Sequence, residues 1–125
     1  MFIVCIVDDD ASVRKSLANL LRSAGYRSRV FASGEEFLAL ENFDDIACLL
    51  LDLKMTGLSG IDVMHALTAQ DRKLPVICMS AHWDEATMAE SSRYAPIKCL
   101  RKPFSGEDLL SAVESALGGA EFLRE

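Results

Sequence analysis

The chain has 125 residues, half of them hydrophobic, and a formal net charge of −6 at pH 7. This length and apolar content fit one compact domain with its own core. Because the charge balance is acidic and no cluster of Lys and Arg stands out, we expect no direct binding to nucleic acid or anionic lipid, and partners that are proteins or small ligands.

Short β-type runs alternate with helical patterns along the chain. The first, third and fourth runs are almost continuously apolar, which is typical of strands buried on both faces of a sheet. The sequence predicts strands at residues 2–7, 27–31, 47–52, 75–80 and 97–101.

Helices are predicted between and after these strands. The first has an apolar stripe from Val13 to Leu21 and ends at Gly25, and the second begins with a capping box of Ser33 and Glu36. The third helix is expected to begin near Ser59, and the fourth to span 84–93 with a weak apolar face. The fifth is expected to begin at Ser105 and to end at 118–119. The alternation predicts one doubly wound α/β domain with a parallel sheet and right-handed crossovers.

The hydrophobic runs and the cysteines indicate where the protein is located and in what state its thiols are. The longest apolar run, IACLLL at 46–51, is too short to cross a bilayer, and the N-terminus lacks the features of a signal peptide, so we expect a cytoplasmic protein. Four widely spaced cysteines lie in apolar, strand-like runs, which favours reduced core residues over a zinc site or a disulfide: Cys5, Cys48, Cys78 and Cys99.

Polar residues close the strand runs, and this is the main functional signal. Ligands of open parallel sheets bind beyond the carboxyl ends of the strands. The residues expected there are Asp8, Asp9, Asp10, Asp52, Ser80 and Lys102. Each alone has a plainer interpretation, such as a helix cap or a surface lysine. Together they predict a site for Mg²⁺, which prefers oxygen ligands, and for a phosphoryl group held by an ammonium and a hydroxyl.

Four segments together resemble the receiver domain of two-component response regulators, from residue 2 to about residue 117: IVDDDASVRKSL, LLLDLKMTGLSG, VICMSAH and LRKPF. VRKSL and the helix after Ser80 look closest to the FixJ-like branch, in which a receiver usually precedes a LuxR-type helix-turn-helix. The resemblance implies a flavodoxin-like (βα)₅ fold with strand order 2-1-3-4-5. It also implies a receiver at 1–117 and a tail or the start of a linker at 118–125.

By the family pattern, Asp52 accepts a phosphoryl group from a sensor histidine kinase, and the chain is no turnover enzyme beyond its own phosphorylation and dephosphorylation. Lys102 pairs with the phosphoryl oxygens, and the Ser80 hydroxyl moves to bond the new phosphate. Lys102-Pro103 resembles the family's cis-proline bond. In-line positioning and charge neutralisation supply most of the catalysis of such a transfer.

The resemblance also implies the metal ligands. Asp9, Asp52 and the backbone carbonyl of Lys54 hold Mg²⁺, and Asp8 completes the pocket through water. Asp10 is expected to cap a helix. Thr56 stands where the family usually has proline, which removes one restraint from the loop after Asp52.

Other positions concern water access and output. Lys54 and His82 stand where the family controls the access of water to Asp52. Cys99 stands where the family usually has an aromatic residue that turns inward on activation, so we expect the loop 80–83, with Trp83 at the rim of the site, to carry the signal instead. The expected output is partner binding or dimerisation through the fourth helix, fifth strand and fifth helix. Lys98 and Arg101 are expected to contact the partner or the second subunit. Transcription would be controlled through a DNA-binding domain that follows in the full protein.

Two other functions compete. The run VDDDAS fits a haloacid-dehalogenase-type phosphatase with Asp8 as nucleophile, Asp10 as acid/base, and Ser80 and Lys102 as phosphate binders, but it leaves Asp52 unexplained. The other is a receiver-like interaction module that no longer needs phosphate, against which the complete set of site residues argues.

Overall fold

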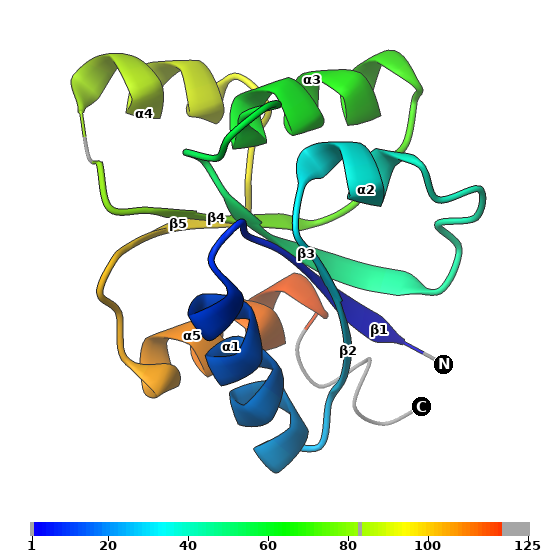
Figure 1. Ribbon diagram of the computed structural model, residues 1–125, viewed down its shortest axis with the longest axis vertical. Helices are drawn as coiled ribbons and strands as arrows, with labels where there is room; N and C mark the ends of the chain where they lie inside the picture. Colours follow the sequence, from blue (N-terminus) through cyan, green and yellow to red (C-terminus); the bar gives the residue numbers. More distant parts are fainter. Residues whose placement is uncertain (1, 83, 119–125) are drawn as a thin grey trace.

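The computed structural model describes residues 2–82 and 84–118, so the predictions for Trp83 and for most of the tail at 118–125 lie outside the described residues. Within these ranges strands and helices alternate along the chain (Figure 1). They are β1 (Ile3–Val7), α1 (Ala11–Ser23), β2 (Arg27–Phe31), α2 (Gly34–Leu38), β3 (Ile46–Asp52), α3 (Gly60–Ala69), β4 (Val76–Ser80), α4 (Glu85–Ser92), β5 (Lys98–Arg101) and α5 (Gly106–Ala116).

The strands form one parallel sheet in the order β2-β1-β3-β4-β5. This confirms the doubly wound fold, and each predicted strand end lies within one residue of the observed one. Figure 1 shows α1 and α5 on one face of the sheet and α2, α3 and α4 on the other. The carboxyl ends of the strands therefore meet at one edge, as the sequence predicts.

Two apolar layers hold the helices to the sheet. On the α1 and α5 side, Leu21, Leu50 and Leu109 belong to one cluster. On the other side, Phe37, Leu49 and Val63 belong to a second. Because β3 is the central strand, alternate residues of its run Leu49–Leu51 enter opposite layers and are fully buried. The termini of β1 and β3 are thus fixed firmly at the site edge.

Polar caps begin the helices at that same edge. Ser59 and Asp62 form a reciprocal capping box at α3, and the Ser33 and Ser105 hydroxyls accept backbone N–H groups at α2 and α5. The exception in packing is α4, in which Ser91 is the buried residue, as its weak apolar pattern predicts. α4 is therefore the helix least anchored to the core.

Other expectations concern membranes and cysteines. Over the described part of the chain, no helix is both long and apolar enough to cross a bilayer. The thiols of Cys5, Cys48 and Cys78 are fully buried, as expected of core residues, whereas Cys99 is partly exposed.

Candidate functional site

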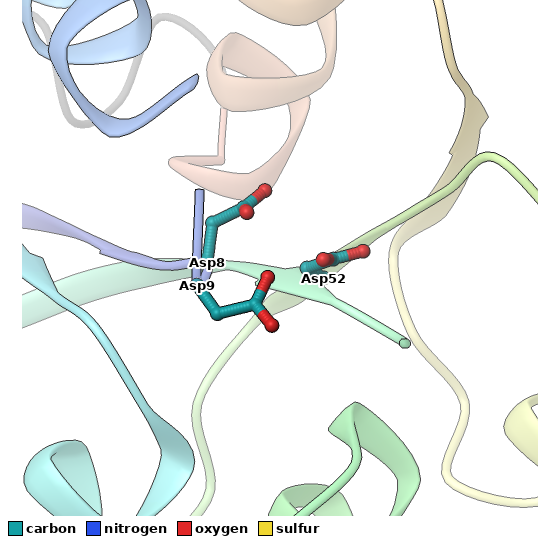
Figure 2. A group of neighbouring side chains, drawn as sticks. All are labelled: Asp8, Asp9 and Asp52. Atoms are coloured by element: carbon teal, nitrogen blue, oxygen red, sulfur yellow. The ribbon is translucent and has the colours of Figure 1, made fainter. Parts of the chain in front are cut away.

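Three carboxylates gather where β1 and β3 end. Asp8 and Asp52 are buried, and Asp9 is exposed beside them. One oxygen from each lies within 4.8 Å of the others, and Figure 2 shows the three side chains grouped around the end of β3. The continuous apolar runs before Asp8 and Asp52 explain the burial, because each run is an interior strand of the sheet that ends with its last residues still inside the molecule. The geometry brings the predicted acidic cluster together.

Lys102 supplies positive charge to this cluster. Its Nζ lies 2.9 Å from Oδ2 of Asp8 and 3.6 Å from Oδ1 of Asp52. Burial lowers the pKa of Lys102, but the hydrogen bond to Asp8 and the charge of Asp52 outweigh it, and the net pKa is raised. In this state the closer partner of Lys102 is therefore Asp8 rather than the expected phosphoacceptor.

Asp8 is held by more than its ion pair. Its Oδ1 accepts the Asp10 N–H at 2.9 Å, and its carbonyl oxygen accepts Nη1 of Arg14 at 2.8 Å. Sequence reasoning did not assign Arg14 a role. The available signal was its place one turn into the helix that follows the carboxylates, which alone does not show where a guanidinium points. Arg14 fixes the end of β1 from the first turn of α1.

Asp52 has the environment of a perturbed carboxyl group. Burial and the charge of Asp8 raise the pKa of Asp52 to about 6, although Lys102 and a backbone hydrogen bond from Lys54 lower it. An ionised Asp52 in the metal-free protein is thus only partly compensated. A cation or a protonated state relieves this cost.

The exposed Asp9 is positioned by the loop after β3. Its Oδ2 accepts the Thr56 N–H at 3.1 Å, a bond that a proline at this position could not donate. Gly57 follows with φ of 81°, in the left-handed region that favours glycine. The loop that was expected to lose a restraint at Thr56 therefore gains a hydrogen bond to a carboxylate of the site.

Ser80 and His82 form a closed turn at the end of β4. The buried Ser80 hydroxyl donates to the His82 carbonyl oxygen at 2.8 Å and accepts the His82 N–H at 3.0 Å. Ser80 is thus bonded to its own loop. His82 and Lys54 are exposed, and each lies two residues beyond a strand-end residue of the site.

The Asp10 carboxylate is engaged at the start of α1. Its Oδ1 accepts the N–H groups of Ser12 and Val13 at 2.8 and 3.2 Å, which makes it the N-cap of α1 as expected. The Lys102-Pro103 peptide bond is cis, also as expected. A carboxylate engaged in capping lacks the free position that an acid/base residue beside Asp8 would need, so the phosphatase alternative is not favoured.

The donor set fits Mg²⁺. It consists of hard carboxylate oxygens, two of them buried, near a single lysine ammonium, so negative charge is in excess at the site. Asp8, Asp9 and Asp52 are the side chains that could hold the ion.

An apolar groove opens beside Lys102. Its volume is about 670 Å³, and it lies between α1 and the segment that follows β5. Its lining residues are Ser12, Val13, Ser16, Leu17, Ala81, Lys102, Pro103 and Phe104. The groove thus adjoins the side chain that contacts the Asp8 and Asp52 carboxylates.

Comparison with known proteins agrees with this geometry. The response regulator receiver domain family matches residues 4–114. The transcriptional regulatory protein TdiR of Thauera aromatica is 39% identical over 114 residues, which cover 91% of this chain and 50% of TdiR. The transcriptional regulatory protein FixJ of Bradyrhizobium diazoefficiens is 33% identical over 118 residues, 94% of this chain and 58% of FixJ. The chain spans about half the length of the curated relatives it matches.

Solved structures show the same likeness. The crystal structure of FixJ-N superposes with a TM-score of 0.84 at 31% identity over 94% of both chains. The response regulator StyR gives a TM-score of 0.86 at 38% identity over 98% of this chain and 62% of its own. With a receiver match over most of the chain and a cluster of carboxylates beside a lysine at its sheet edge, the chain belongs to the response regulator receiver domain family, whose members are signalling domains.

Proposed function

We propose that Asp52 accepts a phosphoryl group from a sensor histidine kinase in a Mg²⁺-dependent reaction. The observation that carries the proposal is the position of its carboxylate. It is buried at the end of the central strand, 3.6 Å from the Lys102 ammonium and grouped with Asp8 and Asp9. A carboxylate placed among compensating charges can approach an anionic donor that would otherwise repel it.

The transfer needs few protein groups. An oxygen of Asp52 attacks phosphorus, the P–N bond of the donor phosphohistidine breaks, and the imidazole leaves with the bonding electrons and takes a proton from solvent. Lys102 neutralises a phosphoryl oxygen by turning from Asp8 toward Asp52. Asp9, Asp52 and the Lys54 carbonyl would hold Mg²⁺, with Asp8 completing the pocket through water, and the ion would supply further positive charge beside the phosphoryl group.

Ser80 responds to phosphorylation of Asp52 by changing its hydrogen-bond partner. Its hydroxyl exchanges the His82 carbonyl for a phosphoryl oxygen, which frees the turn at the start of the loop toward α4. Since α4 buries little beyond Ser91, this movement reaches the surface at small cost. The proposed relay is thus loop movement around 80–83, while Lys54 and His82 limit the access of water to the phosphoryl group.

The partners follow from the surfaces. The groove beside Lys102 would receive the kinase domain that carries the phosphohistidine. The face of α4, β5 and α5 would bind a second copy or another protein, because β5 is an edge strand with exposed Lys98 and Arg101. The regulators among the relatives support control of transcription, through a DNA-binding domain in the full protein. A receiver at 1–117, a tail or linker at 118–125 and a cytoplasmic location remain part of this proposal.

The experiment is phosphorylation by acetyl phosphate followed by intact mass. We expect one phosphoryl group on the wild-type chain with Mg²⁺, and none with EDTA or in Asp52→Asn. Asp44→Asn, an exposed carboxylate away from the site, is the matched control and should behave as wild type. An adduct that survives chelation or the Asp52→Asn change overturns the proposal. If the adduct forms but Asp52→Asn retains full activity in the native pathway, the phosphate-independent module is the correct function.

A further inference from the structure

Two cysteines face each other across the last pair of strands. Cys78 of β4 and Cys99 of β5 are direct partners in the parallel register, and both pack on the apolar layer beneath α2, α3 and α4. Paired residues of neighbouring parallel strands point to the same side of the sheet. The two thiols are therefore neighbours, with Cys78 fully buried and Cys99 partly exposed.

The other two cysteines provide an internal contrast. Cys5 and Cys48 also lie on neighbouring strands, but Cys5 pairs with Leu49, and Cys48 pairs with Val4. Their side chains therefore enter opposite apolar layers. Burial raises the pKa of Cys5 to about 11 and that of Cys48 to about 12, as for inert core thiols.

The surroundings of Cys99 favour its thiolate. The neighbouring Cys78 thiol, followed by the Ser91 hydroxyl, lowers the pKa of Cys99 to about 6 against the opposing effect of burial. The Cys78 thiol also lies 3.9 Å from the Met64 sulfur, so its one proton serves either Met64 or the Cys99 sulfur. The Ser91 hydroxyl also lies 3.0 Å from the Met88 carbonyl oxygen. Because this hydroxyl has one proton, donation to Met88 and donation to the Cys99 sulfur are alternatives.

We propose that Cys78 and Cys99 form a peroxide-sensitive dithiol that is oxidised reversibly to a disulfide between β4 and β5. Adjacent strands are about 4.8 Å apart, inside the Cα separation of about 4.4–6.8 Å that disulfides span. Because Cys99 is partly exposed, the bond would be accessible to reductants and readily reduced.

The chemistry balances with hydrogen peroxide as oxidant. The Cys99 thiolate attacks one peroxide oxygen, the O–O bond breaks, and hydroxide leaves and is protonated to water, giving a sulfenic acid on Cys99. The sulfur of Cys78 then attacks the Cys99 sulfur, and its proton leaves with the hydroxyl group as water. Two thiols lose two electrons and two protons, and peroxide is reduced to two waters. Cys99 meets the oxidant, and the buried Cys78 resolves the sulfenic acid.

The bond would join the strands that carry the responding groups of the site. Cys78 stands two residues before Ser80, and Cys99 stands three residues before Lys102. Oxidation would therefore fix the spacing of β4 and β5 beneath both side chains. This modification does not depend on the phosphoacceptor proposal, because it needs no phosphodonor.

The test is thiol mapping of the reduced 125-residue chain treated with an equimolar amount of hydrogen peroxide. After alkylation in denaturant, we expect two of the four cysteines to remain unalkylated, because they are joined in a disulfide. A non-reduced tryptic digest should join peptide 74–93 to peptide 99–101, and dithiothreitol should separate them. Alkylation of all four cysteines, or a disulfide that includes Cys5 or Cys48, would overturn the proposal.

Variants separate the two roles. Cys99→Ser should abolish the cross-link, and Cys78→Ala should stop the reaction at a Cys99 sulfenic acid that dimedone captures. Cys48→Ala, a buried cysteine of the other layer, is the control and should form the cross-link as wild type does. Sulfenic acid that persists on Cys99 in the wild type, with no cross-linked peptide, contradicts the role of Cys78. Because the wild-type peptide map needs no variant, the proposal remains testable if a substitution prevents folding.

Discussion

The two sides of the site edge handle charge in different ways. At the ends of β1 and β3, the buried carboxylates of Asp8 and Asp52 lie close to Asp9, with Lys102 as their nearby ammonium. At the end of β4, Ser80 is neutral and fully bonded within its own turn. The first side holds unfavourable charge that a ligand can relieve, whereas the second holds a satisfied group that can change partners. In the proposed mechanism, the ligand binds at the ends of β1 and β3, and the loop after β4 moves in response.

The helices also differ in how much apolar surface they bury. Several apolar residues of α1 and α5 are buried against the sheet, among them Leu17, Leu21, Leu109 and Val113. In α4 the buried residue is Ser91. The helices with buried apolar faces pack against the sheet, and the weakly anchored helix follows Ser80, which is the arrangement that the proposed change of loop position requires.

Removing the compensating charge should have the largest effect. Lys102→Met leaves the fully buried Asp8 without its ion-pair partner, and we expect the free energy of unfolding to fall by about 2–4 kcal/mol in EDTA. Lys98→Met, on the exposed edge strand, is the control and should change it by less than about 0.5 kcal/mol. Urea denaturation measures both.

A double variant sharpens this prediction. Asp8→Asn combined with Lys102→Met should lose less stability than the two single losses added together, because the buried charge is removed with its partner. Additive losses would show that the 2.9 Å contact between Lys102 and Asp8 contributes nothing to stability.

A smaller effect of opposite sign is expected at Asp52. Its pKa in the folded protein, about 6, lies above the ordinary value of 3.8, so the ionised group destabilises the folded state, and this penalty disappears as pH falls from above 6 toward 3.8. Asp52→Asn should therefore raise the free energy of unfolding in EDTA by about 1–3 kcal/mol near pH 8. The gain should vanish at low pH.

Thermal unfolding across pH checks this, with Asp44→Asn as control. Adding Mg²⁺ should stabilise the wild type more than Asp52→Asn, because the variant lacks one carboxylate of the proposed site. A variant less stable than wild type in EDTA near neutral pH would mean that Asp52 is well compensated without metal.

The smallest effect concerns α4. We expect its backbone amides to exchange with solvent about tenfold faster or more than those of α1 and α5, because little apolar surface holds it in place. Hydrogen exchange followed by mass spectrometry gives the comparison. Equal protection in α1 and α4 would remove the basis for a loop-borne signal.

The sequence predicts those parts of the fold and the site that depend on local patterns along the chain. The apolar runs into Asp8 and Asp52 predict buried strands with carboxylates at their ends, and Ser59 and Asp10 mark helix starts correctly. These features are local, since periodicity and capping depend on neighbours in the chain.

Pairings across the fold could not be read in this way. That Lys102 lies closer to Asp8 than to Asp52, or that the Thr56 N–H reaches Asp9, depends on side-chain directions that spacing does not give. The same holds for the thiols, because a shift of one residue in the register of β5 would place Cys99 on the other face from Cys78.

The most direct test of the account is to locate the phosphoryl group at residue level. After phosphorylation with acetyl phosphate and Mg²⁺, borohydride reduces an aspartyl phosphate to homoserine, and tandem mass spectrometry of the peptides identifies the position. The account predicts homoserine at Asp52 alone. Homoserine at Asp8 would instead match the phosphatase alternative and contradict the assignment of Asp52.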